Sequence, residues 1–162
     1  LLISWIWYAI TGISSNSHGR SLLWSSDIHQ FFLSSLRFAS NESLQHIFQC
    51  LSFYFDDSSS TQILQLFTQL TPSLPQTLNR CLGTIDSLYE GLVLMSHLST
   101  NQSLSLLIGK AKGCQLLMKF MNKYQNDKRM IEIIFLTIKN LCENSLENIQ
   151  RFQGFRVMRF FV

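Results

Sequence analysis

The last third of the chain contains one helical pattern twice, over residues 92–121 and again over residues 131–162. In each copy an apolar helix ends on a leucine, a polar turn follows, and a second apolar helix leads to a glycine. The matched positions are Leu98 and Leu141, which are 43 residues apart, and Gly113 and Gly154, which are 41 apart. Such a period is typical of stacked helical units that cannot bury their apolar faces alone. It therefore predicts an all-α fold, arranged as a helical solenoid.

Residues that break helices are scarce elsewhere in the chain. The two prolines, Pro72 and Pro75, fall in one turn, and apolar residues recur at spacings of three and four. We expect helices over residues 2–11, 20–39 (one helix or two), 42–55, 62–71, 76–82, 84–98, 103–112, 114–124, 128–143, 145–153 and 155–162.

Several polar residues stand where these helices need an N-cap, and a glycine stands where two of them turn. The expected caps are the run Ser25, Ser26 and Asp27, then Thr61, Asp127 and Asn144. Gly154 falls between two expected helices, where a positive φ is often required.

The composition favours one folded domain. Hydrophobic residues make up 46% of the 162 residues and charged residues 14%, against a typical charged share of roughly 25%. The chain begins without a methionine and ends inside an apolar run. We therefore expect residues 1–162 to be a single helical-repeat domain from a longer protein.

The stretch IFLTIKNLCENSLENIQRFQGFRVMRFF resembles the armadillo repeat. It has the Asn-Leu pair that ends an apolar helix (Asn140 and Leu141), the Asn-Ile pair in a short helix (Asn148 and Ile149), and the glycine that follows. The preceding copy is similar, with His97 in place of Asn140. The best repeats are therefore 84–124 and 128–162, and HEAT repeats remain an alternative subtype.

The resemblance is looser upstream of these two repeats. Leu70 and Gly83 fit the register of the turn and second helix, but Leu70 lies only 28 residues before Leu98. We therefore expect a closing helix to be missing there, and an irregular N-terminal half with no clear register over residues 1–60.

The resemblance implies a binding role. The long third helix of each armadillo repeat lines a concave groove, and the asparagine of Asn-Leu hydrogen-bonds the main chain of an extended partner. This role carries over to Asn140, with His97 doing part of the same work and Lys139 setting charge preference. The alternative is that Asn140 only ties neighbouring helix ends together. The expected function is a scaffold or adaptor that binds a protein partner, as a peptide or a helix.

The charge of the chain is uneven along its length. Residues 1–100 carry three basic and six acidic residues, whereas residues 101–162 carry ten basic and four acidic ones. The basic set consists of Lys110, Lys112, Lys119, Lys123, Lys128, Arg129, Lys139, Arg151, Arg156 and Arg159. An acidic peptide is one partner that this set fits, and nucleic acid is the alternative. A solvated convex face is the third interpretation.

Motifs that carry catalysis are absent from the sequence. The four histidines are dispersed, the seven glycines form no phosphate loop, and His46 with Cys50 supplies only two metal ligands. We expect no enzyme activity, no metal, no cofactor and no small-molecule substrate. The scattered cysteines indicate a reducing, intracellular compartment, either cytoplasmic or nuclear.

The apolar start, over residues 1–13, has two interpretations. It is too short for a membrane-spanning helix, which needs roughly 20 residues, so a buried helix is favoured. The lesser alternative is a truncated hydrophobic anchor that would make this a membrane-associated segment.

Overall fold

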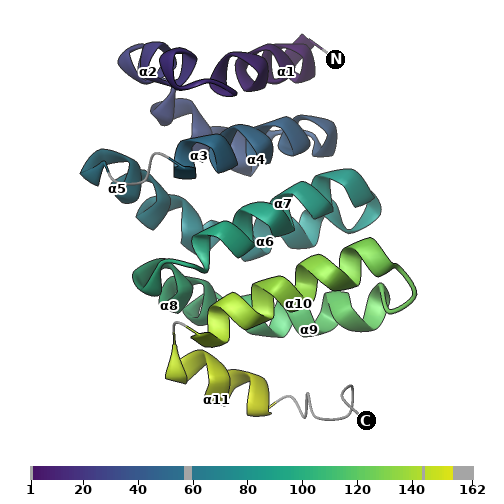
Figure 1. The fold of residues 1–162 in the computed structure, drawn as a ribbon. Helices are drawn as coiled ribbons and strands as arrows, with labels where there is room; N and C mark the ends of the chain where they lie inside the picture. Colours follow the sequence, from purple (N-terminus) through teal and green to yellow (C-terminus); the bar gives the residue numbers. More distant parts are fainter. Residues whose placement is uncertain (1, 57–59, 144, 155–162) are drawn as a thin grey trace.

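The computed structural model describes residues 2–56, 60–143 and 145–154, and the regular structure within these ranges is entirely helical (Figure 1). The α-helices are α1 (Leu2–Ser14), α2 (Ser17–Ser25), α3 (His29–Phe38), α4 (Asn41–Asp56), α5 (Thr61–Leu70), α6 (Leu74–Arg80), α7 (Ile85–Leu98), α8 (Gln102–Lys110), α9 (Gly113–Lys123), α10 (Lys128–Glu143) and α11 (Leu146–Gly154). Short 3₁₀ turns over Thr71–Ser73 and Cys81–Gly83 flank α6. The prediction of an all-α chain is confirmed.

Most helix bounds lie within about three residues of the sequence-based expectation, and the helix expected over 128–143 matches α10. Residues 20–39 form two helices, separated at residues 26–28. The helix expected over 155–162 lies outside the described residues.

One of the predicted caps, Asp127, is confirmed. The Asp127 carboxylate accepts a hydrogen bond from the Met130 amide at 3.1 Å, as expected for the N-cap of α10. Before α11, the Ser145 hydroxyl accepts from the Asn148 amide at 3.2 Å. The predicted cap Asn144 lies outside the described residues.

Two other predicted caps are wrong. Ile28 occupies the N-cap position of α3 without a side-chain hydrogen bond, and Asp27 instead turns the chain with a φ of 58°. Aspartate is one of the few side chains that tolerate this left-handed backbone. Thr61 is the first residue inside α5, and Ser60 at the N-cap position makes no side-chain bond.

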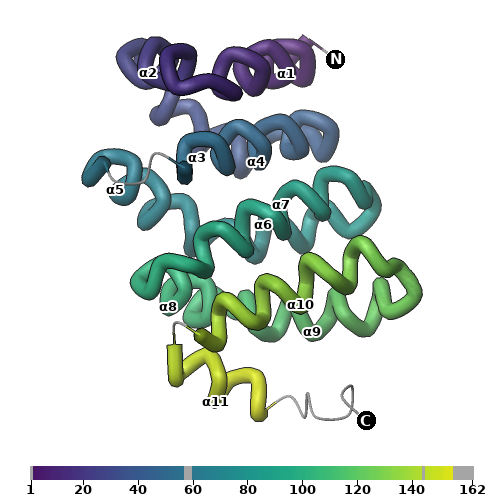
Figure 2. The backbone as a smooth tube through the Cα atoms, viewed as in Figure 1, coloured from purple at the N-terminus to yellow at the C-terminus, as the bar shows by residue number. Residues whose placement is uncertain are grey.

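The four helices α1, α4, α7 and α10, which are every third helix along the chain, pack against one another in succession. The helices α1, α4, α7 and α10 begin at residues 2, 41, 85 and 128, so their starts are 39, 44 and 43 residues apart. Each contacts the following one, and Figures 1 and 2 show them stacked in order from the N-terminal to the C-terminal end. The shorter helices form two further columns, α5–α8–α11 and α3–α6–α9. The core is one continuous cluster from Trp7 to Phe152.

This arrangement corrects the expectation of a missing closing helix. Leu70 ends α5, which belongs to a short-helix column, so it is not the counterpart of Leu98 at the end of the long helix α7. The counterpart of α7 upstream is α4, which ends at Asp56. Gly83 is also out of register, because it lies just before α7, whereas Gly113 opens α9. The spacing and successive packing of the long helices therefore continue from α7 back to α4 and α1.

Four of the seven glycines, Gly19, Gly91, Gly109 and Gly113, lie where an added Cβ would clash, and none of the described glycines forms a left-handed turn. Gly154 is the last residue of α11, and none of the described glycines has a positive φ, so that prediction is wrong. At the corner between α8 and α9 the positive φ belongs to Lys112, at 67°. A Cβ on Gly109 would lie 1.9 Å from the Asn148 side-chain oxygen, so only glycine lets α8 approach α11 this closely.

Polar side chains, one buried and one exposed, join each group of helices to the next. The Asn148 amide nitrogen is fully buried and donates to the Ser105 carbonyl and hydroxyl oxygens at 3.0 and 3.1 Å. The Arg80 guanidinium donates to the carbonyl oxygens of Leu36, Arg37 and Ala39, which end α3. The Arg80 bonds satisfy carbonyl groups at the end of α3 that the helix itself leaves without a partner.

We expect Asn148→Ala to lower the free energy of unfolding by about 2–3 kcal/mol, because it removes the hydrogen bonds that a fully buried amide makes to Ser105 and leaves a small cavity. Urea denaturation followed by circular dichroism measures the change. Gln150→Ala, an exposed position on the same helix, is the matched control and should cost under about 0.5 kcal/mol. Equal losses of unfolding free energy in the two variants would show that the hydrogen bonds from Asn148 to Ser105 do not stabilise the fold.

Candidate protein-binding surface

The long helices α4, α7 and α10 each bury one stripe of side chains and leave another in solvent. On α10 the buried stripe includes Ile134, Thr137 and Leu141. The opposite stripe carries exposed residues at helical spacing, namely Arg129, Glu132, Leu136 and Lys139. Because successive long helices pack side by side, their exposed stripes share one side of the molecule, which we call the long-helix face.

Asn140 contacts the neighbouring long helix. Its amide nitrogen donates to the carbonyl and to the hydroxyl oxygen of Ser96 on α7, both at 3.1 Å. The side chain is half-buried. This geometry supports the interpretation in which Asn140 ties the C-terminal ends of α7 and α10 together. A role in holding a partner backbone stays a prediction.

The two other predicted groove residues lie close to the same end. His97 follows Ser96 directly and is exposed on the last turn of α7. Lys139 is exposed on α10, with its ammonium 3.6 Å from the Glu143 carboxylate. The structure therefore brings Asn140, His97 and Lys139 to the C-terminal ends of two adjacent long helices.

An aromatic and ionic contact joins the opposite ends of the same two helices. The Arg129 guanidinium lies 3.7 Å from the centre of the Tyr89 ring and 3.8 Å from the Asp86 carboxylate. Arginine stacked on tyrosine keeps its edge available for further hydrogen bonds. Sequence inspection assigned Arg129 to a basic patch and did not anticipate this contact, which needs the register between α7 and α10.

A cavity on the long-helix face was missed entirely by the sequence analysis. It has a volume of about 540 Å³ and lies between α1 and α4, lined by Ser4, Trp5, Tyr8, Glu42, Gln45 and His46. Trp5 and Tyr8 are 66% and 59% exposed, and their rings meet at 83° with centroids 6.0 Å apart. The Tyr8 ring also meets the His46 ring edge to face at 5.3 Å.

This aromatic pocket combines aromatic rings with a carboxylate. Aromatic faces attract cations, and Glu42 adds a full negative charge at the rim. The arrangement suits a basic side chain better than an acidic one. The exposed aromatics of residues 1–13 were the signal in the sequence, but they were read there as core or anchor.

The predicted basic set does not form one patch. Lys119 and Lys123 lie on α9 and donate to Asn79 and to the Leu82 carbonyl at 2.8 and 2.9 Å. Lys110 and Lys112 flank the corner between α8 and α9, and Lys128, Arg129 and Lys139 lie on α10. Arg151 lies on α11, where it contacts Glu147 and Asn148. Arg156 and Arg159 lie outside the described residues.

The cysteines are packing residues in this fold. Burial raises the pKa of Cys50 and of Cys81 to about 11 and that of Cys114 to about 12. Burial also raises the pKa of Cys142. Thiols with raised pKa values stay protonated at neutral pH and are poor nucleophiles. Within residues 2–56, 60–143 and 145–154, no group of three His, Cys, Asp or Glu side chains is placed to hold a metal ion.

We expect Asn140→Ala to lower the free energy of unfolding by about 1 kcal/mol, because two hydrogen bonds to Ser96 are lost. His97→Ala, at an exposed position one residue from Ser96, should change it by less than about 0.5 kcal/mol. Chemical denaturation compares the two. A larger loss for His97→Ala would contradict this assignment of the helix-tying role.

The buried thiols also predict alkaline sensitivity. A cysteine whose pKa is higher in the folded than in the unfolded state stabilises the fold below the unfolded pKa, and that contribution is lost as pH rises toward the folded value. We therefore expect the free energy of unfolding to fall between pH 9.0 and about pH 11. Denaturation curves across this range test it. The double variant Cys50→Ala/Cys81→Ala should show a smaller fall, and an unchanged fall would assign the effect to other groups.

Each helix in the described part of the chain falls short of the length and apolarity needed to cross a membrane. In comparisons with known proteins, no family model, no curated protein and no solved structure matches the chain.

Proposed function

We propose that this chain is a section of an armadillo-type helical solenoid that binds a protein partner along its long-helix face. The support for the architecture is the three-helix period, with long helices that begin 39, 44 and 43 residues apart and pack in sequence. Units that contact only their neighbours build an extended surface, which suits an extended partner. The scaffold or adaptor role follows from this surface.

The observation that carries the proposal is the aromatic pocket on the long-helix face. A monomeric protein seldom leaves two large aromatic rings and a carboxylate around one cavity without a use for them. In the proposed complex, a basic side chain of the partner enters between Trp5 and Tyr8, and Glu42 pairs with its charge. The partner then extends along α4 and α7 toward α10.

The α10 end of the long-helix face carries paired charges of both signs. Arg129 and Lys139 lie near opposite ends of α10, each within 3.8 Å of a carboxylate, and His97 is exposed on the last turn of α7 near Lys139. In the proposed complex the aromatic pocket selects the basic side chain, and these polar groups help to orient the rest of the partner. Asn140 keeps α7 and α10 in place beneath this end through Ser96.

The nucleic-acid alternative has less support on this face. The cations of Lys128, Arg129 and Lys139 each lie within 3.8 Å of a carboxylate, so their charge is largely compensated. Phosphate binding that depends on counterion release needs uncompensated lysines and arginines. The same face also carries Glu42, Asp86 and Glu90, which repel phosphates.

Selection from random peptides displayed on phage tests the proposal. We expect the chain to enrich peptides that contain basic residues, and the purified peptides to bind the variant Trp5→Ala/Tyr8→Ala about tenfold more weakly, because the cation–π contacts are lost. Glu42→Gln should weaken binding by a smaller factor.

The matched control is Leu22→Ala/Phe31→Ala, which removes two apolar side chains of similar exposure, 54% and 58%, from α2 and α3. It should leave peptide affinity unchanged. Peptides that lose affinity equally in both double variants, or in neither, would overturn the proposed binding mode.

A further inference from the structure

The charges of this chain are separated between two sides of the fold. The helices α5, α6, α8 and α9 contain no aspartate or glutamate, although they carry Arg80, Lys110, Lys119 and Lys123. Lys112, at the corner between α8 and α9, adds another positive charge. The long helices carry most of the carboxylates, namely Glu42, Asp56, Asp86, Glu90, Glu132 and Glu143. The side formed by α5, α6, α8 and α9 is therefore positive on its own.

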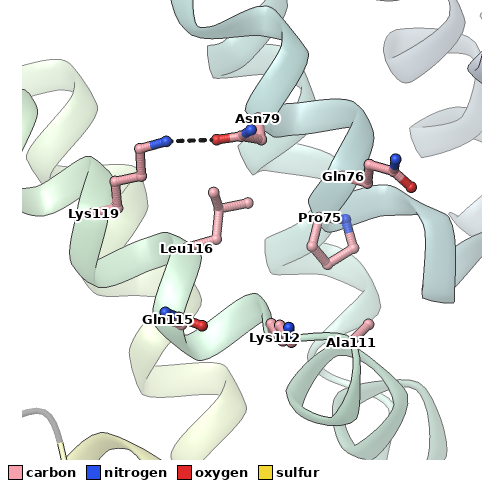
Figure 3. A pocket seen from close by; sticks show the side chains of 8 residues that line it. All are labelled: Pro75, Gln76, Asn79, Ala111, Lys112, Gln115, Leu116 and Lys119. Carbon is pink, nitrogen blue, oxygen red and sulfur yellow. Dashed lines mark hydrogen bonds between the residues drawn. The ribbon is translucent and has the colours of Figure 1, made fainter.

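Two adjoining hollows lie on this positive side. The larger, of about 720 Å³, lies between α6 and α9 and is lined by Pro75, Gln76, Asn79, Ala111, Lys112, Gln115, Leu116 and Lys119 (Figure 3). The smaller, of about 400 Å³, is lined by Gly109, Lys110, Lys112, Cys114, Gln115 and Arg151. Lys112 and Gln115 line both hollows, so the two form one trough across the first turn of α9.

The lining of the trough is suited to oxyanions. Its charged members are Lys110, Lys112, Lys119 and Arg151, and no carboxylate lines either hollow. Arg151 is already paired with Glu147 at 3.1 Å, so the three lysines supply the uncompensated charge. Figure 3 shows Lys119 reaching across to Asn79, whose side-chain oxygen lies 2.8 Å from the ammonium. This contact holds one cation at the wall of the larger hollow.

Neutral amides complete the lining and aromatic rings are missing from it. Gln76, Asn79 and Gln115 offer hydrogen-bond donors that phosphate oxygens accept. None of the residues that line the two hollows is Phe, Tyr or Trp. Single-stranded nucleic acid binds through bases stacked on aromatic side chains as well as through phosphates. The trough therefore suits the phosphate groups of a small ligand better than a nucleic-acid strand.

We propose that this trough binds a soluble ligand that carries two or more phosphate groups, with one group in each hollow and Lys112 between them. Lys119 and Asn79 contact the group in the larger hollow, and Lys110 and Arg151 contact the group in the smaller one. The site uses α6, α8, α9 and α11, so it is separate from the long-helix face and does not depend on the proposed protein binding.

Isothermal titration of the full chain with inorganic tripolyphosphate tests this site. The diagnostic variant is Lys112→Asn/Lys119→Gln, in which asparagine tolerates the φ of 67° at position 112 and glutamine keeps a donor toward Asn79. We expect the affinity to fall about tenfold or more, because two charge-assisted contacts are lost. Inorganic monophosphate, which reaches only one hollow, should bind more weakly than tripolyphosphate.

The matched control is Lys128→Gln/Lys139→Gln, which removes the same charge from α10 on the other side of the fold. It should change the affinity by less than about twofold, since screening by salt limits the effect of distant charges. Thermal unfolding by circular dichroism confirms that both variants are folded. No heat of binding from the wild-type chain, or equal weakening in the two variants, would overturn the proposal. The proposal would also be overturned if an oligothymidine bound more tightly than tripolyphosphate and both double variants weakened that binding equally. Such a result would indicate a diffuse positive field and no specific site.

Discussion

The packing of each long helix against the next is the constraint on which the rest of the structure depends. A helix such as α7 has an apolar stripe too wide to be covered by its own short neighbours, so it is buried between α4 on one side and α10 on the other. Gly91 shows how close this packing is, because a Cβ there would lie 2.2 Å from the Leu78 side chain and 2.8 Å from the Phe48 ring. Once the long helices are stacked, the short helices can only occupy the remaining sides, and hydrogen bonds from the buried Asn148 and the exposed Arg80 hold them there.

The same stacking explains why charge differs between the two sides of the fold. Along the sequence, the imbalance appeared as an acidic first part and a basic last part. In the fold, acidic residues gather on the long helices, where Asp86, Glu132 and Glu143 have basic neighbours on α10. The short helices α8 and α9 carry lysines with no carboxylate among them. Two surfaces with different chemistry result, one with aromatic, acidic and mixed-charge character and one that is positive.

The sequence predicted the helices well because their signals are local. Apolar spacing and the scarcity of proline need no knowledge of distant residues, and the Asp127 cap depends only on the next three residues. The predicted register of the helices was wrong where it depended on a short sequence pattern. Leu70 and Gly83 matched a pattern of one leucine and one glycine, although α5 and the turn before α7 occupy other places in the period. Gly154 was expected to turn the chain, but the positive φ at such a corner falls on Lys112.

The sequence by itself determined that this chain is helical, since helicity follows from the order of apolar and polar side chains. Tertiary structure alone decided which side chains meet. Trp5 and Tyr8 share a cavity with Glu42 only because α1 packs on α4. Asn140 meets Ser96, and Lys112 joins two hollows, for similar reasons of packing. These contacts join residues roughly 35 to 44 positions apart, and a separation of that length has no local signal, because the register between helices is set by side-chain fit.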